Sequence, residues 1–331
     1  MTKRPLGWIV SLLLLALSFW LGISIGAVQI PLSTLWGGSE DTTATTIVWN
    51  IRMPRVFLAA LVGAALAVAG ASFQALLKNP LADPYTLGVS SGASVGAVAT
   101  LFFGLSIPFV GMFTLPLLSM VGALVTLLLV LTFARAMDKS LRMETIILTG
   151  IITSSFFGAM ISLMIALTGE ELRQIIGWLL GSVAMRTWVH VQMIAPFVVV
   201  AGGWLLFRAR DLNALQLGED RAHHLGVNVA LVKKEVLIGG SVLTGAAVAV
   251  SGTIGFVGLV VPHMTRLLFG ADNRHVLPLS MINGASLLIL CDLVARTIIE
   301  PTELPIGVMT ALLGAPVFAW IFFRQRTKGA R

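Results

Sequence analysis

Few side chains in this sequence could act chemically on a substrate. Asp292 and Arg296 stand four residues apart in an apolar stretch, so a helix would place them on one face, where they can neutralise each other. The one cysteine, Cys291, excludes a disulfide framework and a cysteine-ligated metal site. The histidines show no H-x-x-x-H spacing, and the absence of a Gly-Lys dipeptide excludes a G-x-x-x-x-G-K-[ST] phosphate loop. We therefore predict no catalytic residue, no metal site and no cofactor in this chain.

Three arginines have a different chemical use. Arg52 and Arg55 flank Met53–Pro54 just before a long apolar run, and Arg296 ends another. A guanidinium group can bind a carboxylate through two parallel hydrogen bonds. These arginines are therefore candidate contacts for carboxylates on a ligand or on a docking protein. Contact with lipid headgroups is the alternative.

The composition indicates that these residues belong to a membrane protein. Of the 331 residues, 57% are hydrophobic and 11% are charged, whereas soluble domains have about 25% charged residues. A bilayer core about 30 Å thick needs about 20 apolar residues per helix, so the apolar residues could supply roughly eight to ten spans. We predict an all-α polytopic membrane protein.

Ten apolar runs define the predicted spans of a single domain, residues 1–331. Nine are clear, and the run 253–270 is interrupted by glycines, Pro262 and His263. The predicted spans are residues 6–30, 56–77, 87–105, 110–134, 144–168, 189–207, 236–251, 253–270, 276–299 and 304–323.

The distribution of Lys and Arg supports ten spans. These residues stay on the cytoplasmic side in short loops. With ten spans and both termini cytoplasmic, only five of the 22 Lys and Arg residues lie outside, whereas omitting 253–270 places ten outside. The five are Arg52, Arg55, Arg173, Arg186 and Arg296. Since this bias accounts for most of the net charge of +7, no nucleic-acid partner is expected.

Two stretches of the sequence resemble each other. Residues 61–70 read LVGAALAVAG and residues 243–252 read LTGAAVAVSG, with seven identities in ten positions. In the ten-span topology the first runs inward and the second outward, which predicts the inverted repeat common in transporters. The alternative is that such small-residue patterns recur in any tightly packed membrane helix.

Two polar segments are candidate docking surfaces. Residues 211–230, on the cytoplasmic side, predict two short helices, the first capped by Asn213 and ended by Gly218, the second started by Glu219 and ended by Gly226. Such helices could lodge in a groove of a partner, although a solvated interfacial loop is the alternative. Outside, Glu170–Gly181 predicts a short helix with Glu171 and Trp178, which could form an external lip.

Four stretches resemble the FecCD family of ABC importer permeases over nearly the whole chain. They are RMPRVFLAALVGAALAVAGASFQALLKNPLADPYTLGVSSGAS (52–94), LGEDRAHHLGVN (217–228), GTIGFVGLVVPHMTRLLFGADNRHVLP (252–278) and ELPIGVMTALLGAPVFAW (303–320). The resemblance implies the type II ABC importer permease fold with ten transmembrane helices. It also implies a bacterial cytoplasmic (inner) membrane location, with the N- and C-termini cytoplasmic.

The resemblance further implies partners and site residues. A second permease subunit (an identical copy or a close paralogue), two ATPase subunits that carry ATP and Mg²⁺, and an extracytoplasmic substrate-binding protein are expected beside membrane lipid. Arg52, Arg55 and Arg296 would meet the binding protein. The remaining residues implied are, for ATPase coupling, Leu217, Gly218, Glu219, Asp220, Ala222, Leu225 and Gly226, and for the cytoplasmic gate, Asn79, Pro80, Leu81, Thr149 and Gly150.

The function implied is import of a metal chelate, namely an iron–siderophore complex, haem or cobalamin, by a transport subunit that is not itself an enzyme. A self-contained ion-coupled secondary transporter is the alternative, which the predicted repeat would suit. The lack of a second buried carboxylate for an ion relay in the spans opposes that alternative.

Overall fold

The computed structural model describes residues 3–26, 42–138, 143–299 and 302–329, and every regular element in these ranges is helical. The elements of the first half are α1 (Lys3–Ser24), α2 (Thr42–Thr46), η2 (Ile47–Arg52), α3 (Met53–Leu76), η3 (Pro84–Leu87), α4 (Val89–Phe102), η4 (Gly111–Phe113), α5 (Thr114–Met137) and α6 (Met143–Leu167). The others are α7 (Leu172–Leu179), α8 (Trp188–Phe197), η5 (Val198–Gly202), α9 (Gly203–Phe207), α10 (Ala209–Gln216), α11 (Glu219–His224), α12 (Val229–Ser251), α13 (Val257–Phe269), α14 (Asn273–Thr297) and α15 (Ile306–Gly329).

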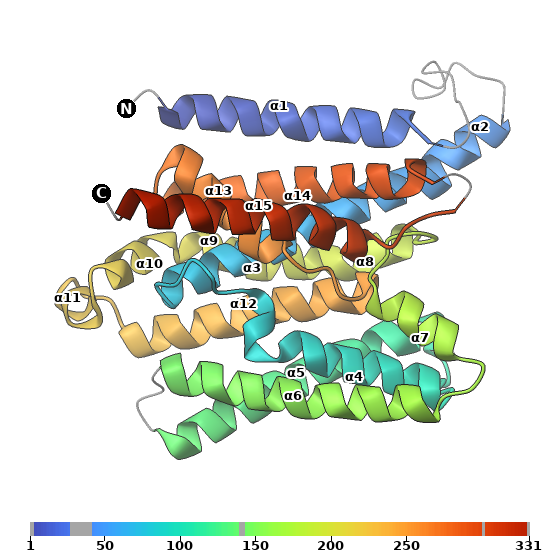
Figure 1. Ribbon diagram of the computed structural model, residues 1–331, viewed down its shortest axis with the longest axis horizontal. Coiled ribbons are helices and arrows are strands. Elements are labelled where there is room, and N and C mark those ends of the chain that lie inside the picture. Colours follow the sequence, from blue (N-terminus) through green and yellow to red (C-terminus); the bar gives the residue numbers. More distant parts are fainter. Residues whose placement is uncertain (1–2, 27–41, 139–142, 300–301, 330–331) are drawn as a thin grey trace.

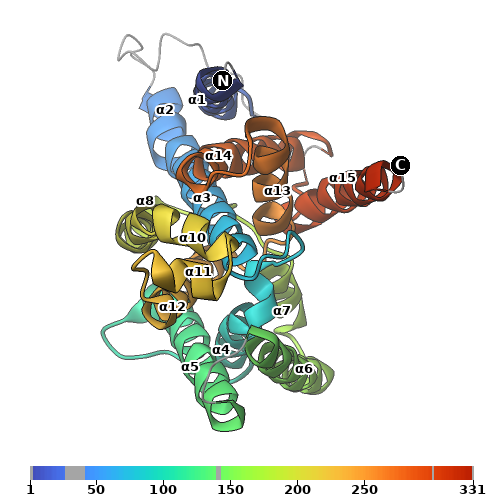
Figure 2. The same ribbon diagram turned by 90° about the vertical axis from the view of Figure 1, so that its left-hand side faces the viewer.

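The long helices lie side by side in one bundle (Figure 1). One end carries the start of α1, the end of α15 and the short helices α10 and α11, and we call it the terminus-bearing end. The opposite end carries α2 and α7. Viewed along the bundle, α3 lies near the centre, whereas α1, α5, α6 and α15 lie at the periphery (Figure 2).

Helix α3 occupies the centre because its residues are small. Buried residues make up 89% of its most apolar stretch. A Cβ atom on Gly63 would collide with the Gly284 carbonyl of α14, and one on Gly70 would collide with the Gly258 carbonyl of α13. Glycines therefore allow three helix backbones to touch. In a membrane, such close packing stabilises the helix contacts, because lipid tails are as apolar as the side chains.

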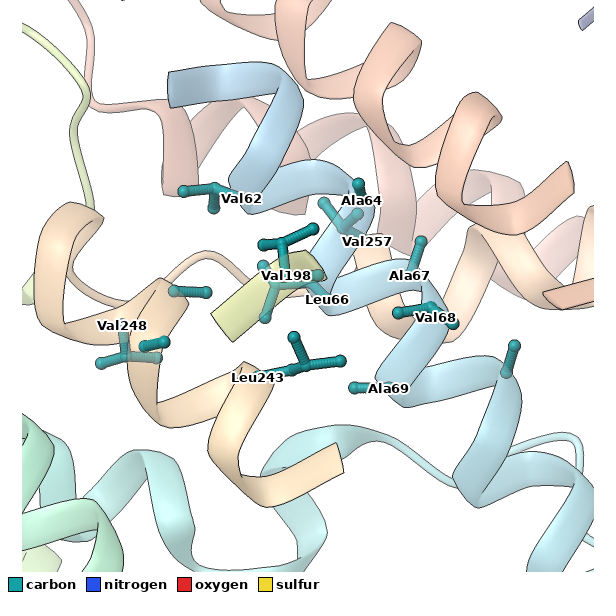
Figure 3. Close-up of a cluster of buried hydrophobic side chains, with 14 of the residues drawn as sticks. Val62, Ala64, Leu66, Ala67, Val68, Ala69, Val198, Leu243, Val248 and Val257 are labelled. Carbon is teal, nitrogen blue, oxygen red and sulfur yellow. The ribbon is translucent and has the colours of Figure 1, made fainter. Parts of the chain in front are cut away.

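Branched apolar side chains fill the space on the other face of α3. Val62 and Leu66 of α3 lie beside Val198 of η5 and Leu243 of α12 in the buried cluster of Figure 3. Each of these four side chains is buried. The core thus joins helices from both halves of the chain around α3.

Within the described residues, seven helices are long and apolar enough to cross a membrane by themselves. Two further apolar helices, Val89–Phe102 and Val257–Phe269, are shorter, and the apolar part of α15 is Ile306–Ala319. At 1.5 Å per residue, a helix of 14 residues is about 21 Å long, less than a bilayer core. Among the described residues, these three helices match the predicted spans 87–105, 253–270 and 304–323. Residues 27–30 of the first predicted span lie outside the described residues.

The second predicted span, 56–77, begins too late. The structure has one continuous helical stretch, Thr43–Leu76, of 34 residues. Pro54 does not end it, because the π-helix η2 leads directly into α3. The proline has no N–H to donate to the preceding turn, and the carbonyl of Trp49 in that turn accepts from Trp188 Nε1 at 2.8 Å. Arg52 and Arg55 therefore lie within this stretch rather than before its entrance.

The two similar stretches, 61–70 and 243–252, lie in α3 and α12, which pack against each other and run in opposite directions (Figure 1). Their continuations differ. Gly70 lies inside α3, whereas Gly252 caps α12 with φ of 72°. The next residues after Gly252 lead into α13, whereas those after Gly70 complete α3. The inverted repeat therefore stays a prediction.

Candidate functional site

Helices α10 and α11 form a compact pair at the terminus-bearing end. Gly218 separates them with φ of 118°, and Gly226 follows α11 with φ of 83°, conformations that glycine adopts without steric strain. As predicted, Gly218 follows the first helix and Glu219 starts the second. The capping prediction for Asn213 is wrong, since α10 begins at Ala209 and Asn213 lies in its middle.

The apolar side chains of this pair point in two directions. Leu212, Leu215 and Ala222 are buried against the bundle, whereas Leu217 and Leu225 are 57% and 64% exposed. Glu219 and Asp220, between the two exposed leucines, are exposed as well. The pair thus presents two apolar side chains and an acidic turn away from the protein, as a docking element requires.

The pair is tied to the long helices by hydrogen bonds. Asn213 donates from Nδ2 to Asp272 Oδ1 at 2.7 Å and accepts from the backbone N–H of Asn273 at 2.9 Å. The side-chain hydrogen bond from Arg274, with help from Asn213, holds the pKa of Asp272 well below its ordinary value. Since Asp272 caps α14, these bonds fasten α10 to the start of α14.

Two ion pairs attach the same segment to α12. Arg208 lies 2.6 Å from Glu235 and 2.9 Å from Asp211. Lys233 lies 2.7 Å from Glu219 of α11. Hydrogen bonding to Glu235 and Asp211 raises the pKa of Arg208. The segment is therefore fastened to the start of α12.

At the opposite end, a charged cluster joins α3 to α14. Arg55 donates from Nε and Nη2 to both carboxylate oxygens of Asp292 at 2.9–3.0 Å, and from Nη1 to Glu303 Oε1 at 2.8 Å. Arg296 Nε lies 3.9 Å from Asp292 Oδ2. The sequence predicts Arg296 as the partner of Asp292, but Arg55 is the closer one, because packing of α14 on α3 brings its guanidinium over the carboxylate.

The three predicted docking arginines are all buried. Arg55 and Arg296 are each 8% exposed and Arg52 is 4% exposed. Arg52 donates to the carbonyls of Ile23 at 2.8 Å and Ser24 at 2.9 Å, and Arg296 donates to that of Gly22. The guanidinium groups of Arg52 and Arg296 therefore bind the end of α1, and those of Arg55 and Arg296 belong to the charged cluster, all within this chain.

The predicted gate residues fall into two groups. Asn79, Pro80 and Leu81 lie in the exposed turn that follows α3. Thr149 and Gly150 are buried in α6, where a Cβ on Gly150 would lie 2.6 Å from the carbonyl of Thr86 in η3. Helix α6 therefore contacts the chain between α3 and α4 closely at Gly150, where it meets η3.

The predicted lip helix is present as α7, at the opposite end. Glu171 is exposed at its start, whereas Trp178 is buried beneath it. The chain after α7 is fastened to the end of α12, because Ser182 donates its backbone N–H to the carbonyl of Ser251 at 2.7 Å. Trp178 therefore belongs to the packed side of the helix.

Sequence reasoning missed two residues of interest. In the sequence, Glu303 stands out only as the first residue of the stretch 303–320, and Arg186 only as one of the five arginines predicted outside. The available signal for Glu303 was its place at the same bundle end as the arginines, where an unpaired cluster of positive charge would need an acid. Its partner could not be read from the sequence, because Arg55 is 248 residues away.

The comparisons with known proteins agree over almost the full length. The family model described as FecCD transport family matches residues 14–324. The uncharacterized ABC transporter permease protein YvrB of Bacillus subtilis is 57% identical, covering 99% of this chain and 96% of that protein. The hemin transport system permease protein HmuU of Yersinia pestis is 40% identical, with 92% and 91% covered.

A solved structure has the same fold. An inward-facing conformation of an ABC transporter assigned to the metal-chelate type superposes with a TM-score of 0.86 at 32% identity, covering 96% of this chain and 98% of that one. This chain is a multi-pass membrane protein and a transport permease that belongs to the FecCD transport family.

Proposed function

We propose that this chain is the permease subunit of an ABC importer that takes a metal chelate from a substrate-binding protein and releases it into the cytoplasm. The relatives are named for hemin and for vitamin B12, and the solved structure is assigned to metal chelates. Iron–siderophore complexes, haem and cobalamin are thus the cargo classes. The observation that carries the proposal is the pair α10–α11, two short helices fastened to the long ones with two leucines exposed.

In the proposed topology the chain crosses the bacterial cytoplasmic membrane ten times. The seven long helices together with α4, α13 and α15 make up this number. Both termini and α10–α11 are then cytoplasmic, and α3 and α12 are the counterparts in an inverted repeat. The charge bias supports the orientation, because most Lys and Arg residues belong to segments at the terminus-bearing end.

Each of two ATPase subunits would receive one α10–α11 pair in a surface groove. Leu217 and Leu225 would enter the groove, Glu219 and Asp220 would meet its polar rim, and Gly218 and Gly226 would fix the turns. Ala222 would anchor α11 to the bundle. ATP and Mg²⁺ would be bound by those subunits, and their closure would displace α10 and, through Asn213 and Asp272, the start of α14.

The opposite end would receive the binding protein. Arg52, Arg55 and Arg296 remain the proposed contacts, with a restriction set by their burial. Of their partners, Glu303 is the accessible one, since its side chain is 40% exposed. An acidic side chain of the binding protein would replace Glu303 at Arg55 Nη1 while Asp292 keeps the rest of the guanidinium in place.

A second permease subunit, identical or a close paralogue, would complete the pathway. A second subunit would cover the exposed apolar side of α6, since only 17% of the most apolar stretch of this helix is buried within this chain. The gate would form where Asn79, Pro80 and Leu81 follow α3 and where Thr149 and Gly150 of α6 face η3. Helix α7 would form the external lip, with Glu171 exposed at its start and Trp178 packing the helix against the bundle.

Reconstitution tests the proposal. The chain is purified from its native membrane in mild detergent, co-purifying proteins are identified by mass spectrometry, and uptake is measured in liposomes. Recovery of an ATPase in about equal amount together with a binding protein, and chelate uptake that needs ATP, would support it. Recovery of the chain alone, with uptake driven by a proton gradient without ATP, would overturn it in favour of a secondary transporter.

A further inference from the structure

A cavity of about 300 Å³ lies beneath α7 at the opposite end of the bundle. It is bounded by α7 on one side and by the ends of α4 and α12 and the start of α5 on the others. The residues that line it are Leu101, Leu115, Gln174, Gly177, Trp178, Ser182, Arg186 and Ser251. Most of the surface is apolar and no Asp or Glu contributes to it, so its polar groups decide what it can bind.

Two of the lining side chains carry buried N–H donors without an acceptor among the described residues. They are Nε1 of Trp178 and Nε of Arg186. The whole Trp178 side chain is buried, with 8% exposed. A buried donor left without an acceptor has lost its hydrogen bonds to water without replacement, and the loss is greater when the donor is charged. Two such donors on one cavity therefore indicate an acceptor that the chain itself does not supply.

The charge of Arg186 is also uncompensated. None of the described carboxylates forms an ion pair with it; its nearest recorded polar neighbour is His190, whose Nε2 lies 3.3 Å from Arg186 Nη1. Burial lowers the pKa of Arg186, and an arginine guanidinium is not deprotonated in proteins. The Arg208 guanidinium, by contrast, has two carboxylate partners. Arg186 is half-buried, and its Nε is shielded from solvent without a counter-ion, so an anion is the acceptor that fits.

We infer that this cavity binds the carboxylate group of a small monocarboxylic acid, with Arg186 Nε and Trp178 Nε1 as the donors. One guanidinium balances one negative charge, whereas a phosphate dianion would leave a charge uncompensated among apolar side chains. The volume is at the small end of ligand pockets, so the acid has a short apolar chain.

The indole N–H of Trp178 provides a direct test. The chain has eight tryptophans, so the ¹H–¹⁵N spectrum of the purified full-length protein has a small set of indole signals, and Trp178→Phe identifies the relevant one. Butyrate is the probe and butyramide its uncharged match. Titration with butyrate should shift the Trp178 signal downfield and saturate, whereas butyramide should leave it in place.

Three variants make the result specific. Arg186→Gln should weaken butyrate binding at least tenfold, and Arg173→Gln, which alters an exposed arginine of α7 outside the cavity, should not weaken it. Gly177→Leu should abolish binding with both donors intact, because no atom lies within 4 Å of a Cβ built there and the added side chain can fill the cavity.

No saturable shift with butyrate, an equal shift with butyramide, or unchanged affinity in Arg186→Gln would each overturn the inference. The measurement needs no ATP, binding protein or chelate. Its failure would therefore leave the proposed import function standing, and failure of that function would leave this site standing.

Discussion

The Arg55 guanidinium of α3 binds both carboxylate oxygens of Asp292 in α14, through three hydrogen bonds of 2.9–3.0 Å, although the two residues are 237 positions apart. Asp292 is 1% exposed. A planar guanidinium in this bidentate geometry fixes the rotation of one helix against the other. The pair therefore sets the register of α3 and α14 at the opposite end of the bundle.

Removing Arg55 should destabilise the fold strongly. In Arg55→Leu, Asp292 keeps only Arg296 at 3.9 Å, and breaking a buried ion pair on one side costs about 3–5 kcal/mol. The double variant Arg55→Leu with Asp292→Leu should recover part of this loss, because no buried charge is then left alone. Thermal unfolding of the detergent-purified protein measures both. Glu303→Gln is the control, since loss of a half-exposed partner should cost only about 0–1 kcal/mol. Equal losses for Arg55→Leu and Glu303→Gln would contradict this.

Gly70 should tolerate no side chain. The methyl group of Gly70→Ala would meet the carbonyl of Gly258, so α3 and α13 would have to separate. Overpacking of this kind costs about 1–3 kcal/mol. Gly158→Ala in α6 is the matched control, because no atom lies within 4 Å of its Cβ position; it should be neutral or stabilising by up to about 1 kcal/mol, the helix propensity of Ala over Gly. The midpoint of thermal unfolding should rank the two, and a lower midpoint for Gly158→Ala would refute the packing account.

The proposed docking of α10–α11 in an ATPase groove predicts that the exposed leucines matter for ATPase binding and not for the fold. Leu217→Glu and Leu225→Glu should each weaken ATPase binding about tenfold or more, because a charge would enter the apolar groove, a loss of about 1.4 kcal/mol or more. Leu231→Glu is the control, since Leu231 is 45% exposed at the start of α12, outside the pair. Binding to the co-purified ATPase by pull-down and biolayer interferometry measures the effect. Equally weak ATPase binding in Leu231→Glu would contradict this prediction, because any added negative charge on this surface would then weaken binding.

Acid should loosen the attachment of α10 to α14 through Asp272. The hydrogen bond from Arg274 holds the Asp272 pKa below its ordinary value, so the folded state favours the carboxylate. The stabilisation is fully present above the ordinary pKa of about 3.9 and is lost as the pH falls through the lowered folded-state value. The difference in unfolding midpoint between the native chain and Asp272→Asn should be constant from pH 7 to pH 5 and shrink below about pH 4. A difference that grows on acidification would have the wrong sign for this mechanism.

Local sequence signals predicted the short elements well. Glycine before Glu219 and glycine after Leu225 predicted the turns of α10–α11, because the positive φ found at Gly218 and Gly226 is one that other residues rarely adopt. Pro262 interrupts the apolar run 253–270 but does not end α13, which continues to Phe269. Proline is tolerated in membrane helices because neighbouring helices and side chains can satisfy the backbone groups that lose a hydrogen bond. Asn213 does not cap α10, although its side chain forms the kind of hydrogen bonds that a capping residue forms. Its bonds go to Asp272 and Asn273 at the start of α14, a contact that the local sequence does not indicate.

The sequence by itself determined that this chain is helical, that it lies in a membrane, which segments bear most of the basic residues and which family it belongs to. Those properties follow from apolar run length, charge bias and motif, all of which are local along the chain. Only the tertiary structure decided that Arg55 rather than Arg296 is the close partner of Asp292, and that Trp178 and Arg186 share a cavity. Such relationships depend on how helices distant in sequence pack through small residues, and a contact across hundreds of residues leaves no periodic signal in either segment.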